Sequence, residues 1–210
     1  MQTRMIRLIA VAALAIIAVG CGAPRPVKYY VIDPGPAPPA ASAQQLPISL
    51  LVARPYTSHL YRDDRLVFGS GPVQLGTYEY ERWAQTPADM VQEMLVNYLR
   101  GSGQYKGVSR VGSASHGDYI VRSNLLALYE VDQPQLAARF SIRLELFDPK
   151  SHSTVWNMPY EHDEPVGDRN VAAIVEAMDR NVKAGMQFLT GELNKYFAEH
   201  PLQPPATAGN

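Results

Sequence analysis

Apolar and polar residues alternate most regularly in the segment 136–147. Every second residue from Leu136 to Leu146 is apolar, while Arg139, Arg143 and Glu145 occupy positions between them. Successive side chains of a β-strand point to opposite faces, so this pattern predicts an antiparallel sheet with one buried face and one hydrated face. Less regular patterns predict further strands at 46–53, 66–68, 73–80, 106–111, 119–132 and 152–162. Gly-Ser-Gly-Pro at 69–72 predicts a turn that makes 66–68 and 73–80 a hairpin. Residues 56–64 are predicted to form a polar loop.

A helix is predicted over 86–100 by both its end signals and its apolar spacing. Thr86 is a favourable N-cap residue, Pro87 suits the first helical position, and Asp89 follows as in a capping box. Gly101 is a typical helix stop. The apolar positions recur at helical spacing and indicate core packing: Met90, Val91, Met94, Leu95, Tyr98 and Leu99.

A second, longer helix is predicted over 168–200, with Asp168 as its cap. Its apolar residues form one stripe that would cover the apolar face of the sheet: Ile174, Met178, Val182, Leu189, Leu193 and Tyr196. Strands with helices on one side define the fold class. The sequence therefore predicts a single α+β domain, a mostly antiparallel β-sheet with two main helices packed on one face.

The N-terminus has the layout of a secretory signal. Arg4 and Arg7 precede an unbroken apolar run at 8–19, and no acidic residue occurs before Asp33. This run of twelve residues spans roughly 18 Å as a helix, which is short against a hydrocarbon core about 30 Å thick. A cleaved signal peptide is therefore expected, rather than a permanent membrane span.

The end of this segment, Ala18-Val19-Gly20-Cys21, resembles the lipobox of bacterial lipoproteins, in which the cysteine is acylated and becomes the first mature residue. Cys21 is the only cysteine, so it cannot form an internal disulfide in an oxidising compartment. We therefore expect lipidation at Cys21. Gly22 follows it, in place of the Asp that resembles an inner-membrane retention signal, which favours the periplasmic face of the outer membrane over the inner membrane.

Composition and charge limit the possible partners of the mature chain. Formal net charge is −1 for the whole sequence and about −3 without Arg4 and Arg7. Without basic runs, nucleic acid is not an expected partner, and membrane attachment is expected through the acyl anchor. The expected organisation is a signal peptide at 1–20, a lipidated Pro-rich tether at 21–45, the α+β domain at 46–198 and a disordered tail at 199–210.

Three segments contain residue types that occur in catalytic, nucleotide-binding or metal-binding sites. Ser115 and His116 lie close to Asp118, but a nucleophile elbow needs a G-x-S-x-G sequence between a strand and a helix, so a turn is the better interpretation. Gly-Ser-Gly at 101–103 follows a predicted helix, where a dinucleotide loop would precede one. Residues 161–164, Glu-His-Asp-Glu, place His and Glu on one strand face without further ligands at zinc spacing. We therefore expect that the protein is not an enzyme and that it has no cofactor and no metal site.

Several motifs, taken in order, resemble one family. Tyr-Tyr-Val-Ile at 29–32 soon follows Cys21, then a strand ending in Arg-Pro at 54–55, then Leu-Tyr-Arg-Asp at 60–63. Tyr-Glu-Tyr-Glu-Arg-Trp-Ala at 78–84 leads into the first helix. The order resembles that of the ABC-type transport auxiliary lipoproteins, the lipidated component of MCE (mammalian cell entry) lipid-transport systems. Independently of the resemblance, 29–32 is either an incidental apolar cluster or, as we favour, a short strand that docks on the sheet edge.

The resemblance implies a non-catalytic outer-membrane subunit that docks an MCE conduit and moves phospholipids or similar hydrophobic molecules. Its implied partners are an MCE-domain protein and, indirectly, the ABC permease and ATPase of the same system. Two other classes remain open. One is an envelope scaffold or assembly factor unrelated to lipid transport, and the other is a hydrolase that uses Ser115 and His116.

The candidate partner interface comprises Tyr78, Tyr80, Arg82 and Trp83. Aromatic residues before a helix commonly pack in the core, but aromatic residues and Arg are also enriched at protein interfaces. The polar strand face with Arg139, Arg143 and Glu145 leaves a similar choice, between solvated surface and contact between copies in a homo-oligomer.

Overall fold

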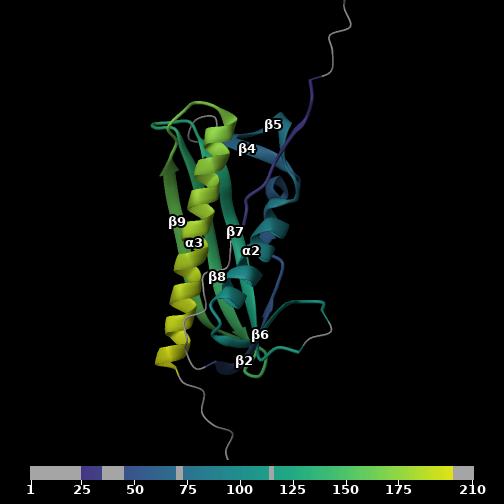
Figure 1. Ribbon diagram of the computed structural model, residues 1–210, viewed down its shortest axis with the longest axis vertical. Coiled ribbons are helices and arrows are strands. Elements are labelled where there is room, and N and C mark those ends of the chain that lie inside the picture. Colours follow the sequence, from purple (N-terminus) through teal and green to yellow (C-terminus); the bar gives the residue numbers. More distant parts are fainter. Residues whose placement is uncertain (1–24, 35–44, 70–72, 114–115, 201–210) are drawn as a thin grey trace, which may run out of the picture.

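The computed structural model describes residues 25–34, 45–69, 73–113 and 116–200 of the chain (Figure 1). The predicted signal peptide, the predicted lipidation site Cys21 and the tail beyond residue 200 lie outside the described residues. The elements in chain order are β1 (Lys28–Tyr30), β2 (Leu46–Val52), β3 (Tyr56–Thr57), the 3-10 helix η2 (His59–Tyr61), β4 (Arg65–Gly69), β5 (Leu75–Trp83), α2 (Pro87–Gly101), β6 (Tyr105–Arg110), β7 (Tyr119–Val131), β8 (Ala137–Asp148), β9 (Ser153–Pro165) and α3 (Val171–Glu199).

The long strand β7 is the centre of the nine-stranded sheet. On one side it pairs with β8, which pairs with β9, and both pairings are antiparallel. On its other side β7 pairs in parallel with three short strands, one after another along its length: β2, β3 and β4. Representative pairs are Leu50–Tyr119, Tyr56–Asn124 and Phe68–Glu130. Three successive strands from the N-terminal part of the domain, β2, β3 and β4, therefore all pair with one later strand, β7.

Further strands extend the sheet at the two ends of β7. At one end β6 lies parallel to β2. At the other end β5 lies antiparallel to β4, which confirms the predicted hairpin, and β1 lies parallel to β5. The longest ladders are antiparallel, so the predicted α+β domain is confirmed, while the shorter parallel ladders were not predicted.

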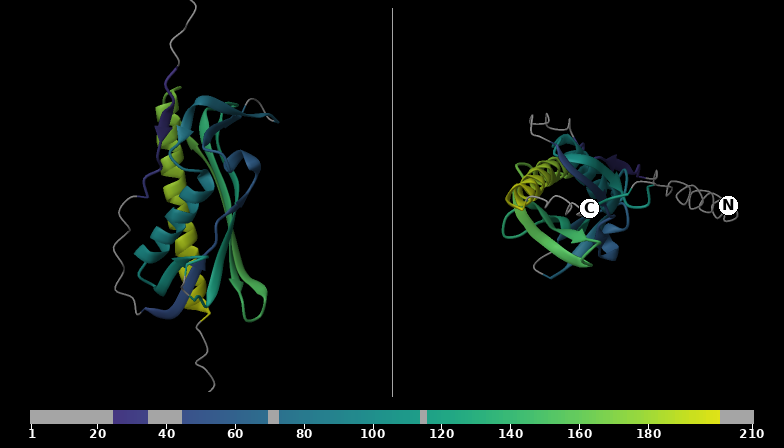
Figure 2. Two further views of the ribbon diagram at one scale, coloured as in Figure 1. Left: turned by 90° about the vertical axis from the view of Figure 1, so that its right-hand side faces the viewer. Right: turned by 90° about the horizontal axis from the view of Figure 1, so that it is seen from below.

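Both main helices cover the same face of the sheet (Figure 2). Helix α3 packs on β8 and β9 and extends along the length of the molecule, and α2 packs beside it near β6. The predicted stripe of β8 is confirmed, because Ala138, Phe140, Ile142, Leu144 and Leu146 are all fully buried beneath the helices. None of the helices in the described ranges is long and apolar enough to cross a membrane.

One polar side chain fixes α3 on the sheet. Asn181 is fully buried, and its side-chain amide donates hydrogen bonds of 2.8 Å to the backbone oxygens of both Ala138 and His162. Its Oδ1 accepts a 3.0 Å hydrogen bond from the Tyr160 hydroxyl. A buried amide with its partners satisfied specifies one register between helix and sheet, where an apolar residue would allow sliding.

The two helix starts differ in how well the sequence predicts them. Thr86 caps α2 as expected, with the Asp89 backbone N–H donating to its hydroxyl. The prediction that Asp168 caps α3 was wrong. Asn170 is the N-cap, and its Oδ1 accepts a 2.9 Å hydrogen bond from the backbone N–H of Ala173. Both residue types are good caps, and sequence alone does not show which one lies one position before the first helical residue.

The prediction of a plain polar loop at 56–64 was also wrong. The segment holds β3 and η2, and it contributes the buried side chains of Thr57 and Tyr61 to the domain. The Thr57 hydroxyl donates a 2.9 Å hydrogen bond to the backbone oxygen of Leu125 on β7. Two inward-facing residues among polar ones are too few to produce a recognisable period.

Candidate partner-binding site

Strand β1 is held on the outer edge of β5, which confirms the prediction that residues 29–32 dock on the sheet. Lys28, Tyr29 and Tyr30 lie opposite Glu81, Arg82 and Trp83. The backbone N–H of Ala84 donates a 2.8 Å hydrogen bond to the Tyr30 oxygen.

Contacts of side chains reinforce this docking. The Tyr30 hydroxyl donates a 2.7 Å hydrogen bond to Glu81, and two residues later Ile32 is buried in the hydrophobic core. Burial and the neighbouring Glu81 carboxylate raise the pKa of Tyr30 to about 12. The part of the N-terminal segment that follows residue 27 is therefore a component of the domain.

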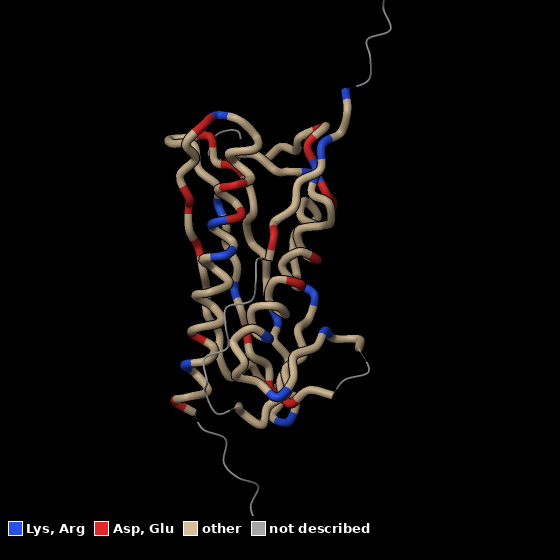
Figure 3. Tube along the Cα trace, in the orientation of Figure 1, with Lys and Arg blue, Asp and Glu red and all other residues tan. Residues whose placement is uncertain are grey.

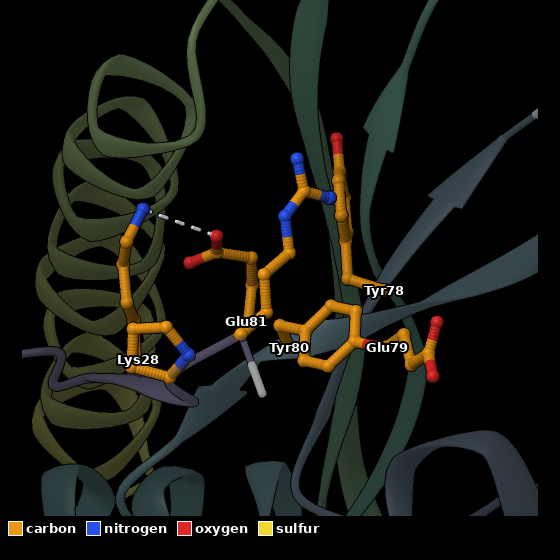
Figure 4. Close-up of a pocket in the computed structure, with 7 residues that line it drawn as sticks. Lys28, Tyr78, Glu79, Tyr80 and Glu81 are labelled. Atoms are coloured by element: carbon orange, nitrogen blue, oxygen red, sulfur yellow. Dashed lines mark hydrogen bonds and ion pairs between the residues drawn. The ribbon is translucent and has the colours of Figure 1, made fainter. Parts of the chain in front are cut away.

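An irregularity in β5 creates a cavity beside β1. Arg65 lies opposite Arg82, but only two residues later Val67 lies opposite Thr77, so the residues of β5 between these pairs are bulged. A cavity of about 550 Å³ opens at this bulge (Figure 4). It is lined by Arg25, Pro26, Lys28, Tyr78, Glu79, Tyr80 and Glu81.

Charges within the cavity are balanced. The ammonium of Lys28 lies 3.3 Å from a carboxylate oxygen of Glu81, the pair joined by the dashed line in Figure 4. The Glu79 carboxylate next to Tyr80 raises the pKa of the Tyr80 hydroxyl. With two cationic and two anionic residues in the lining, the cavity lacks the excess charge that would favour a charged small ligand.

Tyr78 is tied into the domain from this same strand. Its hydroxyl donates a 2.5 Å hydrogen bond to Glu130 on β7, and its ring packs edge-on against Phe68 with 5.1 Å between centroids. Burial, followed by this hydrogen bond to Glu130, raises the pKa of Tyr78. The side chain is therefore committed to an internal contact.

Arg82 and Trp83 are also used within the domain. Arg82 Nη1 lies 2.6 Å from an Asp64 carboxylate oxygen, and the backbone N–H of Trp83 donates to the Asp64 backbone oxygen at 2.6 Å. The Trp83 side chain is only 1% exposed and belongs to the core. Of the four residues singled out from the sequence, Tyr78 and Tyr80 meet at one cavity, whereas Arg82 and Trp83 do not line it.

The structure shows the surroundings of two of the segments with candidate catalytic or metal-binding residues. His116 is exposed between β6 and β7, and Ser115 lies outside the described residues. In the segment 161–164, Asp163 pairs with Arg139 at 2.6 Å and Glu164 pairs with Arg180 at 3.0 Å. No group of three metal-ligating side chains occurs among residues 25–34, 45–69, 73–113 and 116–200.

Two carboxylates that organise this site, those of Glu81 and Glu130, were not predicted from the sequence. Glu81 forms an ion pair with Lys28 and accepts a hydrogen bond from the Tyr30 hydroxyl. Glu130, which is only 8% exposed, accepts a hydrogen bond from the Tyr78 hydroxyl. Glu130 lies opposite Ala138 because a register shift between Leu125 and Ala127 offsets the two strands. The sequence signal was an acidic residue among apolar ones near the end of a strand, which is also typical of a solvated strand end.

Comparison with solved structures places this architecture in a known class of α+β domains. Protein XCC0632 from Xanthomonas campestris matches with a TM-score of 0.73 at 20% identity, covering 83% of this chain and 99% of that chain. An uncharacterised protein matches with a TM-score of 0.64 at 11% identity, over 80% and 99%. The hypothetical protein CT253 from Chlamydia trachomatis gives 0.52 at 9% identity, over 73% and 99%. At these identities the likeness concerns the fold alone.

The family follows from the sequence itself. Residues 30–187 match the model of the ABC-type transport auxiliary lipoprotein component family, and the chain belongs to that family. The resemblance found in the order of motifs is thereby confirmed, and the chain is an auxiliary lipoprotein associated with ABC-type transport. Among proteins with curated descriptions, none matches this chain.

Proposed function

We propose that this protein is a non-catalytic outer-membrane subunit of an MCE/ABC-type system that transports phospholipids or related hydrophobic molecules between membranes. It is anchored through acyl chains on Cys21 and docks the MCE conduit at the outer membrane. The observation that carries the proposal is the family match over residues 30–187 directly downstream of a lipobox.

The use of charged residues within the domain supports a non-catalytic role. Carboxylates that could serve as acids, bases or metal ligands are paired with cations of the same domain, as in Arg54–Asp89, Arg82–Asp64 and Arg139–Asp163, each at 2.6 Å. Such pairs occupy the carboxylates with partners of the same domain, which suits a structural surface better than an acid–base site.

The partner contact is proposed to centre on Tyr80. This residue lines the cavity beside β1, while Tyr78 supports the strand from behind through Glu130. Aromatic side chains anchored on a rigid strand lose little conformational freedom on binding and commonly contribute strongly to affinity.

Affinity purification tests the proposal. A C-terminally tagged chain is solubilised in detergent from its native envelope, and co-eluting chains are identified by mass spectrometry. We expect an MCE-domain protein, with the permease and ATPase at lower yield. Recovery of the bait alone, or of a cell-wall protein, would favour the scaffold alternative.

The same experiment tests the contact at Tyr80. Tyr80→Ala should lower the recovery of the MCE protein at least about fivefold, since a central aromatic residue is typically worth more than about 1 kcal/mol. The matched control is Tyr56→Ala, because Tyr56 is an exposed tyrosine on a different strand, β3. Equal recovery with both variants would move the interface elsewhere.

Localisation is tested separately by membrane fractionation. Wild type is expected in the outer-membrane fraction, and Gly22→Asp, which introduces the residue resembling a retention signal, is expected in the inner-membrane fraction. Cys21→Ser should leave the membrane fraction altogether. Outer-membrane recovery of Cys21→Ser would contradict acyl anchoring.

A further inference from the structure

The docking of β1 leaves a short connection between Cys21 and the domain. Six residues, 22–27, lie between Cys21 and Lys28, the first residue of β1. An extended chain covers at most about 3.6 Å per residue, so Lys28 lies within about 25 Å of Cys21 and Arg25 within about 14 Å, whatever the conformation between them. A tether that remained free as far as residue 45 would reach roughly 85 Å by the same measure.

The direction of β1 decides which end of the domain this connection approaches. Because β1 is parallel to β5, the residues before Lys28 lie beside the earlier part of β5. The cavity lining agrees, since Arg25 and Pro26 line it together with Tyr78 and Glu79. Figure 1 shows this N-terminal segment leaving at the end of the molecule where β4 and β5 lie.

The opposite end of the domain carries the turn between β8 and β9 and the end of α3. Phe147 near that turn pairs with Ile120 at the start of β7, whereas the β4–β5 hairpin joins β7 through Phe68 and Glu130 near its other end. Helix α3 has 29 residues and runs the length of the sheet, so the two ends are separated by roughly 44 Å.

Exposed aliphatic side chains occur at the end that the connection approaches. Val73 is 95% exposed, Leu75 is 41% exposed and Val27 is 40% exposed. The nearby cations Arg25 and Lys28 are balanced by Glu79 and Glu81, and Figure 3 shows Lys and Arg interspersed with Asp and Glu over the molecule. A surface of this kind favours contact with lipid through apolar side chains rather than through charge.

We propose that the β4–β5 end of the domain is a membrane-contact surface, on which Val27, Val73 and Leu75 rest against the lipid bilayer. The inference rests on the acyl anchor at Cys21 of the proposed function. It adds an orientation: the β8–β9 turn and the end of α3 point away from the anchoring membrane. A partner that reaches the cavity at Tyr80 then approaches from the side, close to the membrane.

The short connection between Cys21 and β1 favours the lipid bilayer as the partner of this surface. By the same measure the anchor holds Val27 within about 22 Å of the lipid-attached residue, and Val73 and Leu75 belong to the β4–β5 hairpin at the same end, so the aliphatic residues stay at high local concentration near the lipid. Single contacts of this kind would be too weak to bind a vesicle without the anchor, but they suffice to orient a domain that is already attached.

The orientation can be measured with single cysteines, because Cys21 is the only native cysteine and is consumed by acylation. Val73→Cys and Lys150→Cys are each introduced into the full-length acylated protein and labelled with the environment-sensitive fluorophore NBD. Lys150 is exposed in the β8–β9 turn and serves as the matched position at the far end. The proteins are reconstituted into phosphatidylethanolamine/phosphatidylglycerol vesicles that contain a doxyl-labelled quencher lipid.

We expect blue-shifted, strongly quenched fluorescence at position 73 and unquenched fluorescence at position 150. The quenching at position 73 should remain in 0.5 M salt and in zwitterionic phosphatidylcholine vesicles, because the contact is apolar. Equal exposure at both positions, or quenching at position 150, would overturn the proposed orientation. Loss of quenching in salt would overturn its apolar character.

Flotation of the same samples separates this inference from the proposed function. Protein that does not float with vesicles has no functional anchor, and the proposed function fails at that step. Protein that floats without quenching at position 73 retains the anchor but contradicts the membrane-contact surface. Leu75→Ser with Val27→Ser, introduced into the protein labelled at position 73, should float equally and lose much of the quenching.

Discussion

The Tyr78 hydroxyl donates a 2.5 Å hydrogen bond to the Glu130 carboxylate and so joins the bulged strand β5 to the central strand β7. Glu130 lies on the helix-covered side of the sheet, opposite the fully buried Ala138, and is only 8% exposed. A carboxylate in such a position requires a donor, because an unsatisfied buried polar group costs about 1–3 kcal/mol. Tyr78 is therefore primarily a structural support for the cavity.

Tyr78→Phe should lower the free energy of unfolding by about 1–3 kcal/mol, since it removes the donor and keeps the ring that packs on Phe68. Urea denaturation measures the change. The double variant Tyr78→Phe, Glu130→Gln should recover part of the loss, because a neutral amide is less costly to leave unpaired than a charge. A stability unchanged from wild type in Tyr78→Phe would contradict this assignment.

Ile32→Ala should destabilise the domain by about 2–5 kcal/mol, the usual range for a buried Ile, and should loosen β1. Hydrogen exchange provides the specific readout, because the Ala84 N–H donates to the Tyr30 oxygen and should exchange faster when β1 opens. The adjacent Val31→Ala is the control, since Val31 is largely exposed. Similar effects of the two variants would show that β1 is not held by Ile32.

Two glycines of α3 should respond in opposite ways to the same substitution. A Cβ at Gly185 would lie 2.8 Å from the Tyr160 ring and 2.9 Å from the Phe140 ring, so Gly185→Ala should destabilise by about 1–3 kcal/mol through overpacking. At Gly191 a Cβ would meet nothing within 4 Å, and Gly191→Ala should stabilise by about 0.5–1 kcal/mol through helix propensity. Thermal unfolding of both variants measures these changes, and a stabilised Gly185→Ala would mean that α3 is not pressed against the sheet.

Alkaline pH should lower the stability of the domain, in part through Tyr61. Burial raises the pKa of Tyr61 to about 12, above the ordinary value of 10.0. A raised pKa means that the neutral side chain contributes its full stability below about pH 10 and that this contribution is lost as pH rises towards 12. Urea denaturation between pH 8 and 11.5 should show a decline that is less steep in Tyr61→Phe. The exposed Tyr56→Phe should follow wild type, and an equal slope in all three proteins would contradict the assignment.

Local signals predicted the elements well where one pattern dominated. The strict alternation in β8 and the combination of Thr86 with Pro87 and Asp89 each had one physical interpretation, and the structure confirms both. The start of α3 was misplaced because Asp168 and Asn170 are both suitable caps.

The relationships between elements were beyond a single sequence. Strands β2, β3 and β4 pair with β7 in parallel ladders. Apolar spacing shows which face of a strand is buried, but it does not show which strand lies beside it or in which register. The carboxylate of Glu130 could not be assigned to Tyr78 for the same reason. The family resemblance came from the order of motifs, whereas the division of the 78–83 segment into core and cavity required the structure.

The pairing of β1 along the edge of β5 also bears on how the domain would carry a load. A force applied along the axis of β1 from its N-terminal end is resisted at Lys28, Tyr29 and Tyr30 together, because the strand is then pulled in shear along its neighbour. A force directed across the strand would instead peel β1 from its end and break one pair at a time. From β1 the force passes through β5 and β4 to the long strand β7, so this short edge strand would act as a mechanical clamp between the N-terminal segment and the domain.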